Sequence, residues 1–216
     1  MSSRDYKQYC GLARALELVG ERWALLIIRD LSVHPRRYTD LLEGLPGIPT
    51  NVLSTRLKEF ERSGIIERRV APAPQRGILY ALAPAGQALE PAVLTLGRWG
   101  ATQLDDPRDG EIVTPESVTM SLRATFDDGA AAGVTASWEV HAGDIVLHLI
   151  VTNGKLESGT GPAPGGAPDL VITFKPDGLP SYQALVQAAK CGLVELDGRR
   201  ELLGTFLSIF AHPQPA

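Results

Sequence analysis

Apolar residues in the first half of the chain recur every three or four positions, which is the period of an amphipathic helix. Five segments follow this period: residues 10–20, 21–33, 37–47, 49–64 and 84–104. Residues 65–71 and 77–83 instead alternate with a period of two, as paired strands joined by a turn do. The pattern therefore predicts four helices, a β-hairpin and a further helix.

Proline and glycine indicate where these helices begin, bend and end. Pro49 is tolerated in a first helical turn, and Gly64 is typical of a helix end. Pro91 lies inside the last helical segment, where we expect it to bend the helix or to split off its first turn.

Beyond residue 104, segments typical of strands come first and helices follow. Strands are predicted at 118–126, 134–141, 144–154, 169–174 and 193–198, and helices at 179–192 and 199–210. This order predicts an α+β domain with its helices on one face of a sheet. Acidic residues, glycine and two prolines interrupt the apolar pattern at 104–117. We therefore expect a first domain in 1–104, a linker in 105–117 and a second domain in 118–216.

Charge is divided unevenly between the two predicted domains. The whole chain has a net charge of −4, but residues 1–104 contain 14 Lys and Arg against 10 Asp and Glu. The first domain is therefore mildly basic, which leaves DNA open as a partner. Hydrophobic residues make up 44% of the chain, with no apolar run of eighteen residues and no secretory leader pattern. We expect a cytoplasmic protein with no membrane insertion, whose two cysteines stay reduced.

Residues 49–64, drawn as a helix, separate into an apolar and a polar face. The apolar face consists of Leu53, Leu57 and Phe60. The polar face consists of Asn51, Thr55, Lys58 and Arg62, with Ser54 at its edge. Such amide, hydroxyl and cationic groups can bond base edges and phosphates, and a helix fits the major groove of DNA. A solvated helix face has the same composition, so the choice between DNA binding and simple solvation depends on the neighbouring elements.

The neighbouring elements favour DNA binding. A short helix, a turn, a second helix with this polar face and a hairpin follow the winged helix-turn-helix plan. Three hairpin cations suit phosphates or a minor groove: Arg68, Arg69 and Arg76. Arg36 and Arg37, which precede the short helix, are expected to contact phosphates, with plain solubility as the alternative. Arg56 lies about 130° from the centre of the polar face, so a phosphate contact and an ion pair with Glu59 are both expected roles.

The stretches "YCGLARALELVGERWALLIIRDL", "PRRYTDLLEGLPGIPTNVLSTRLKEFERSGIIERR" and "YALAPAG" extend this argument over residues 9–104. They resemble the HxlR-type transcriptional regulators, winged helix relatives of the MarR group. Trp23, Pro35–Tyr38 and Leu53–Glu61 match family motifs, with Phe60 in place of a Leu. The resemblance implies a bacterial homodimer, assembled through the first and last helices of this domain, on a pseudo-palindromic double-stranded DNA operator. Residues 49–51 depart from the family's Ser-Pro-Lys, so a different sequence preference is expected.

Cys10 stands at the start of the first predicted helix, with Lys7 before it and Arg14 one turn later. Helix amino ends and nearby cations both lower the pKa of a thiol. The position matches a cysteine that senses oxidants or electrophiles in some HxlR-type regulators, although Gly11 replaces the proline that usually follows. Redox sensing and a small buried residue at the dimer contact are the two alternatives.

The second domain offers no catalytic constellation. His141 and His148 flank a turn, but no Cys or further His stands near them at the spacing of metal ligands. The sequence contains no nucleophile elbow, phosphate loop or dinucleotide motif. We therefore predict that the protein is not an enzyme and needs neither a metal nor another cofactor.

The last predicted helix carries more apolar residues than one sheet contact needs, since they cover more than one of its faces. The order of strands and helices in residues 115–212 resembles the sterol carrier protein 2 fold. That resemblance implies a tunnel for a lipid or another hydrophobic small molecule, with four candidate lining residues: Trp138, Leu147, Leu149 and Phe206. A filled core that serves as a scaffold or dimerisation domain is the alternative.

The leading hypothesis is a dimeric, sequence-specific DNA-binding transcriptional regulator whose second domain binds a hydrophobic effector. The rival hypothesis is a lipid carrier or scaffold protein in which the helix-turn-helix serves only protein contacts. The two differ in salt dependence, because binding through phosphates weakens steeply as salt rises.

Overall fold

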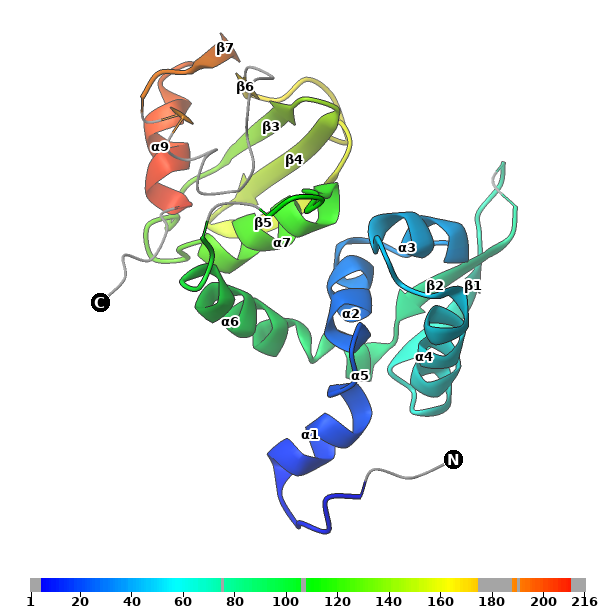
Figure 1. The fold of residues 1–216 in the computed structure, drawn as a ribbon. Coiled ribbons are helices and arrows are strands. Elements are labelled where there is room, and N and C mark those ends of the chain that lie inside the picture. The colour runs from blue at the N-terminus through cyan, green and yellow to red at the C-terminus, as the bar shows by residue number, and fades with distance from the viewer. Residues whose placement is uncertain (1–4, 75, 106–107, 175–187, 190, 211–216) are drawn as a thin grey trace. The chain divides into compact units, whose positions relative to one another are not determined.

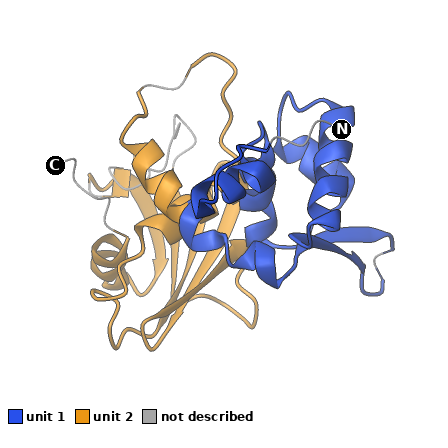
Figure 2. Cartoon of the chain, turned by 90° about the horizontal axis from the view of Figure 1, so that it is seen from below, with its two compact units in different colours: residues 1–93 blue, residues 94–216 orange. Residues whose placement is uncertain are grey.

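The computed structural model describes residues 5–74, 76–105, 108–174, 188–189 and 191–210. The chain divides into two compact units, Met1–Val93 and Leu94–Ala216, which Figure 2 shows in different colours. Each unit has its own hydrophobic core. No helix within the described residues has both the length and the apolar character that crossing a membrane requires.

The first unit contains the helices and the hairpin that the periodicity predicts (Figure 1). Its helices are α1 (Gly11–Val19), α2 (Ala24–Val33), α3 (Tyr38–Gly44), α4 (Thr50–Arg62) and α5 (Pro84–Gln87), and its strands are β1 (Ile66–Val70) and β2 (Ile78–Leu82). A further helix, α6 (Glu90–Ala101), begins in this unit and continues into the second. Pro91 stands in the first turn of α6, which confirms the predicted split of this helical segment.

A single main-chain bridge joins the hairpin to the segment that precedes α3. β1 and β2 pair antiparallel, and the main chain of Arg36 exchanges hydrogen bonds of 2.9 and 2.7 Å with Tyr80 of β2. The core beneath is formed by buried side chains of α2, α3, α4 and β1, among them Ile27, Leu41, Leu53, Leu57, Phe60 and Ile66. The helix-turn-helix and the hairpin are therefore parts of one packed unit.

The second unit is a mixed five-stranded sheet with helices. It contains α7 (Pro115–Thr125), β3 (Ala136–Ala142), β4 (Ile145–Thr152), β5 (Lys155–Thr160), β6 (Leu170–Phe174), β7 (Val194–Gly198) and α9 (Leu202–Ile209). The strand order is β5-β4-β3-β6-β7, and β3 runs parallel to β6 while the other neighbours pair antiparallel. The α+β class is confirmed.

The helices α7 and α9 cover the same face of this sheet. Trp138 on β3 is paired in register with Leu149 on β4 and with Leu170 on β6, so these three side chains share one face. All three belong to a buried cluster that also contains Leu122 of α7 and Phe206 of α9. The opposite face carries Glu139 and His141 of β3 and His148 of β4.

Residues 118–126 form most of α7, so the strand predicted there is wrong. Thr114 caps this helix: its Oγ1 accepts from the Ser117 N–H at 3.2 Å, and the Ser117 Oγ accepts from the Thr114 N–H at 3.0 Å. Pro115 follows as the first helical residue. This start signal lies inside the predicted linker, 105–117, which separates the cap from the rest of the helix. The strand β5 was missed, and most of the helix predicted at 179–192 lies outside the described residues.

Candidate nucleic-acid interface

The helix α4 buries one side and exposes the other, as its sequence predicts. Leu53, Leu57 and Phe60 are buried in the core of the first unit. The helix begins after Pro49 and ends at Ser63, where Gly64 follows with a φ of +69° that favours glycine. Both ends are therefore fixed by local sequence, and packing sets the rotation of the helix about its axis.

The predicted polar face of α4 lies on the exposed side. Asn51, Thr55, Lys58 and Arg62 are exposed, and Ser54 is half-buried. The Thr55 hydroxyl donates to the carbonyl oxygen of Asn51 at 2.8 Å, within the helix. Among the residues that the structure describes, none forms an ion pair with Lys58 or Arg62. This face therefore offers two cationic groups and an amide to an external partner.

The hairpin adds three exposed arginines. Arg68 pairs with Glu61 at 3.1 Å, and its guanidinium lies 5.7 Å from the centre of the Tyr80 ring. Arg69 pairs with Glu67 at 2.7 Å. Arg76, in the turn, pairs with no carboxylate in the described parts of the chain. Exposed ion pairs of this kind contribute about 0 to 1 kcal/mol, so a phosphate can displace the carboxylates at little cost.

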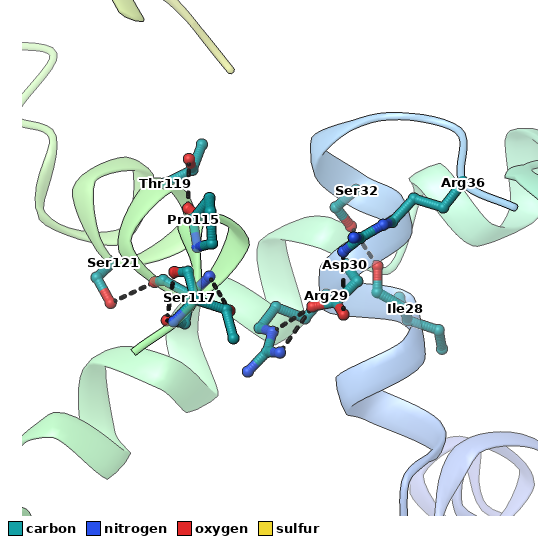
Figure 3. Close-up of polar contacts among 10 residues, drawn as sticks. Ile28, Arg29, Asp30, Ser32, Arg36, Pro115, Ser117, Thr119 and Ser121 are labelled. Atoms are coloured by element: carbon teal, nitrogen blue, oxygen red, sulfur yellow. Dashed lines mark hydrogen bonds and ion pairs between the residues drawn. The ribbon is translucent and has the colours of Figure 1, made fainter. Parts of the chain in front are cut away.

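Arg36 is buried, unlike the other predicted phosphate contacts. It is 9% exposed, and its Nη1 lies 3.6 Å from Oδ2 of the buried Asp30. Figure 3 shows Asp30 between Arg36 and Arg29, whose Nη2 lies 2.7 Å from Oδ1. Withdrawing Arg36 toward a phosphate would leave part of the Asp30 charge uncompensated in the interior. Arg36 therefore holds α2 against the segment before α3 and is not expected to contact DNA.

Arg37, its neighbour in sequence, is half-exposed. Its main-chain N–H donates to Oδ2 of Asp40 at 3.0 Å, which fixes the start of α3. Its guanidinium lies beside the hairpin, where a Cβ atom on Gly77 would be 4.0 Å from Nη1. Arg37 thus stands between the helix-turn-helix and the hairpin with part of its charge open to solvent.

Arg56 makes the ion pair with Glu59 that its position in the sequence predicts. It also pairs with Glu21, at 3.0 Å, in the connection between α1 and α2. The side chain is 17% exposed. Two carboxylates therefore already neutralise Arg56 in the free protein, and a phosphate would have to compete with both.

Tyr38 makes a contact between α3 and α4 that the sequence pattern does not predict. Its hydroxyl donates to the carbonyl oxygen of Thr50 at 2.8 Å and accepts from the Ser54 hydroxyl at 3.2 Å. Nothing in the local sequence pattern relates Tyr38 to residues twelve and sixteen positions later.

Cys10 is exposed at the N-cap of α1. The main-chain N–H groups of Ala13 and Leu12, at the amino end of α1, lower the pKa of its thiol below the ordinary value of 9.0. The direction agrees with the general effect of a helix amino end. A larger thiolate fraction at neutral pH follows.

Large apolar side chains remain exposed on α1 and α6. On α1, Leu12 is 69% exposed and Leu16, one turn later, 42%. On α6, which has no buried residue, Trp99 is 62% exposed and Leu96 is 49% exposed. The first and last helices of the predicted DNA-binding domain thus each present an apolar stripe to solvent.

The four candidate ligand-lining residues of the second unit lie in its packed core. Trp138, Leu147 and Leu149 are 0% exposed, and Phe206 is 3% exposed. The indole Nε1 of Trp138 donates to the carbonyl oxygen of Leu202 at 3.2 Å. These residues are brought together as predicted, and the described residues around them are packed side chains.

Polar side chains on the other sheet face bond to each other and to main-chain groups of the same unit. Glu139 accepts from His141 Nε2 at 2.6 Å and from the Ala163 N–H at 3.0 Å, and His148 Nδ1 lies 3.1 Å from the Gly161 carbonyl oxygen. Burial opposes ionisation of Glu139, but these hydrogen bonds and the nearby histidines outweigh it and lower its pKa below the ordinary 4.5. Within the described residues, no group of three or more His, Cys, Asp or Glu could hold a metal ion.

Known proteins match the first unit and the start of the second. The model of a family described as HxlR-like helix-turn-helix matches residues 18–108. The regulator sll1512 of Synechocystis is 31% identical over 96 residues, which cover 44% of this chain and 71% of that protein. The HTH-type transcriptional regulator YodB of Bacillus subtilis is 37% identical over 95 residues, covering 44% of this chain and 84% of that protein. The chain belongs to the HxlR-like helix-turn-helix family.

The HxlR-like match includes α2 to α6, and with them the polar face of α4 and the hairpin. A crystal structure of quinone-bound YodB from B. subtilis is also similar, with 34% identity, 43% of this chain and 97% of that chain covered, and a TM-score of 0.37. The family consists of DNA-binding transcriptional regulators, so the protein is a regulator and not an enzyme.

Proposed function

We propose that the protein is a homodimeric regulator that places α4 of each protomer in the major groove of a pseudo-palindromic double-stranded DNA operator. The exposed face of α4 carries this proposal, because Lys58 and Arg62 are exposed there beside Asn51 and have no ion-pair partner among the described residues. The three exposed arginines of the adjoining hairpin also favour DNA binding over a helix face that is merely solvated. Such a regulator acts in the cytoplasm, where a bacterial operator lies.

The proposed contacts fall into two classes. Asn51, Ser54 and Thr55 read base edges from the first two turns of α4, where amide and hydroxyl groups suit adenine and cytosine. The cations bind phosphates and fix the register of the protein on the duplex: Lys58, Arg62, Arg37, Arg68, Arg69 and Arg76. Arg56 is a secondary phosphate contact, since Glu21 and Glu59 compete for it.

The dimer is proposed to form through α1 and α6. Leu12 and Leu16 lie on one side of α1, and Leu96 and Trp99 on one side of α6. Apolar stripes of this kind on two helices are typical of surfaces that a second protomer covers. Residues 1–104 would then act as one DNA-binding and dimerisation domain, joined through 105–117 to the domain in 118–216.

Cys10 is proposed as a thiol sensor next to this dimer contact. The lowered pKa and the exposure of its thiol support reactivity with oxidants or electrophiles. A change of charge or size at the start of α1 would alter the dimer contact, and with it the spacing of the two α4 helices. A small residue that serves only packing at the contact is the alternative.

The second unit is proposed to bind a hydrophobic effector, in line with its resemblance to sterol carrier protein 2. The apolar character of α9 supports this, because Leu203 and Leu207 are partly buried against the core in addition to Leu202 and Phe206. Trp138, Leu147, Leu149 and Phe206 would form the inner wall of the binding site. A scaffold with a filled core is the competing proposal, and native mass spectrometry of the purified protein distinguishes the two by the presence or absence of a co-purified lipid.

Salt dependence of DNA binding tests the central proposal. A duplex selected from a random-sequence library by the purified protein is titrated by fluorescence anisotropy at several NaCl concentrations. Each phosphate contact contributes a slope of about −0.9 in log K against log salt, so six cations per protomer give up to about −5 for one half-site. A salt-insensitive interaction, or no selected sequence, would favour the lipid-carrier or scaffold hypothesis.

A further inference from the structure

The hydroxyl of Tyr38 joins the two helices of the helix-turn-helix. Tyr38 is the first residue of α3, and its ring packs partly buried against the core of the first unit. From there the hydroxyl donates to the carbonyl oxygen of Thr50, the first residue of α4, at 2.8 Å. It also accepts from the Ser54 hydroxyl, one turn further along α4, at 3.2 Å. The ring is therefore fixed in α3 while its polar end reaches the first turn of α4.

Tyr38 adds a contact from another helix to the first turn of α4. The N-cap residue is Pro49, which makes no side-chain capping bond. In a regular helix the Thr50 carbonyl oxygen accepts from the Ser54 N–H, and its second lone pair is open to another donor. Tyr38 fills that position, so its hydroxyl, the Thr50 carbonyl and the Ser54 side chain form one connected group. This contact satisfies no N–H group, as a local cap would, and instead ties the first turn of α4 to α3.

The same contact sets which way the Ser54 hydroxyl can bond. Its proton is donated to Tyr38, so toward any partner outside the chain Ser54 presents oxygen lone pairs. Thr55 likewise donates its proton inward, to Asn51. An oriented acceptor in the major groove fits an exocyclic amino group, the N6 group of adenine or the N4 group of cytosine.

We propose that Tyr38 is a positioning residue of the DNA interface, which anchors the first turn of α4 and orients Ser54 as an acceptor for an adenine or cytosine amino group. This inference rests on the proposed function, in which α4 reads bases. Tyr38 itself touches no base in this scheme and acts through Ser54 and Thr50.

Tyr38→Phe removes the hydroxyl and keeps the ring in the core. The variant is compared with the wild-type protein on the selected duplex and on duplexes with single base-pair changes. Discrimination against changes at one adenine or cytosine position should fall roughly 2- to 10-fold, the range for one lost hydrogen bond. Affinity for random DNA and the salt slope should stay the same, because no phosphate contact is removed. Unchanged discrimination in Tyr38→Phe would overturn the proposal.

Tyr80→Phe is the matched control. Tyr80 belongs to the same unit, and its hydroxyl makes no hydrogen bond with the described residues, while its ring keeps the contact with Arg68. This variant should discriminate between duplexes as the wild type does. An equal loss in both variants would show that any missing tyrosine hydroxyl has this effect, which contradicts a specific role for Tyr38.

A double-mutant cycle tests whether Tyr38 acts through Ser54. Ser54→Ala should reduce discrimination at the same base position, and the double variant should lose no more than the larger of the two single losses. Losses that multiply, or that fall at different base positions, would mean that Tyr38 and Ser54 act independently.

Hydrogen exchange in the free protein tests the anchor without DNA. In Tyr38→Phe the amide protons of residues 52–54 should exchange roughly 2- to 10-fold faster than in the wild type, and in Tyr80→Phe they should not change. Equal rates in all three proteins would overturn the anchoring role. If the wild type selects no DNA sequence, the proposed function fails, whereas the exchange result still decides whether Tyr38 holds the turn.

Discussion

Polar side chains in the two units are arranged in opposite ways. In the first unit Lys58 and Arg62 extend from α4 without an ion-pair partner among the described residues. In the second unit the polar face of the sheet is bonded internally: Glu139 accepts from His141, and Asp169 accepts from both the main chain and the hydroxyl of Ser137. Groups that are satisfied within their own fold stabilise it, whereas cations without a partner are available to an external anion.

The same contrast exists within the first unit. Arg36 and Arg37 are neighbours in sequence, yet Arg36 is buried against Asp30 while Arg37 is half-exposed beside the hairpin. A cluster of basic residues in a sequence is therefore a mixture of structural and binding groups. Substitutions at individual residues distinguish the structural groups from the binding groups.

Asp30→Ala should destabilise the protein by about 3 to 5 kcal/mol, because it leaves Arg36 with an uncompensated charge in the interior. Urea denaturation followed by circular dichroism measures the loss, and Asp30→Asn serves if the alanine variant does not fold. Glu67→Ala, which breaks the exposed pair with Arg69, is the control and should cost less than about 1 kcal/mol. Similar small losses for both would remove the structural role given to Arg36.

Replacing both Lys58 and Arg62 by Ala should weaken binding to every DNA sequence and reduce the salt slope by about 2, close to 1 for each phosphate contact. Anisotropy titrations at several salt concentrations measure both quantities. Lys155→Ala is the control, since it removes an exposed cation from the sheet of the second unit. An unchanged slope in the double variant would show that these cations are only part of a solvated helix face.

Glu139→Gln should make stability less dependent on pH in the acid range. The pKa of Glu139 is lowered in the folded protein, so ionised Glu139 contributes stability above its ordinary value of 4.5, which is lost as pH falls through the folded pKa. Urea midpoints should therefore drop more steeply below pH 4.5 in the wild type than in this variant. The exposed Glu157→Gln should keep the wild-type profile, and a wild-type profile in Glu139→Gln would contradict the internal bonding described here.

Cys10 should react faster with iodoacetamide than Cys191 at neutral pH. Both cysteines are exposed, and the lowered pKa of the Cys10 thiol raises its thiolate fraction below pH 9.0. Peptide mass spectrometry during a short reaction gives the two rates in one sample. Equal rates would remove the chemical basis for Cys10 as a sensor, and unchanged operator binding by the fully oxidised protein would exclude the sensing role itself.

Local patterns were enough to predict most of the first unit. Leu53, Leu57 and Phe60 recur at the helical period, so burying them exposes Asn51, Thr55, Lys58 and Arg62 without further information. Gly64 ends α4 and Pro91 stands in the first turn of α6, and both effects depend only on the local backbone. The faces of α4 and the element order could therefore be read from the sequence.

Contacts between distant residues could not be predicted in this way. Arg36 and Arg37 differ because Asp30 and Tyr80 meet Arg36 from other elements. The role of Tyr38 depends on Thr50 and Ser54, which lie on the next helix. The strand-like pattern that begins at Val118 predicts a strand, but the residues form α7, whose cap lies four residues earlier, at Thr114. Each of these outcomes depends on packing between segments and not on the pattern within one.

In the proposed complex the start of α4 reads bases and the hairpin binds phosphates. One experiment measures the affinity of four single variants for the selected operator and for random duplex DNA. Two variants change α4 (Asn51→Ala and Thr55→Ala), and two change the hairpin (Arg69→Ala and Arg76→Ala). The α4 variants should lose roughly 1 to 3 kcal/mol of preference for the operator and keep their affinity for random DNA, whereas the hairpin variants should weaken both equally. A uniform loss in all four variants would contradict the division between base-reading and phosphate-binding residues.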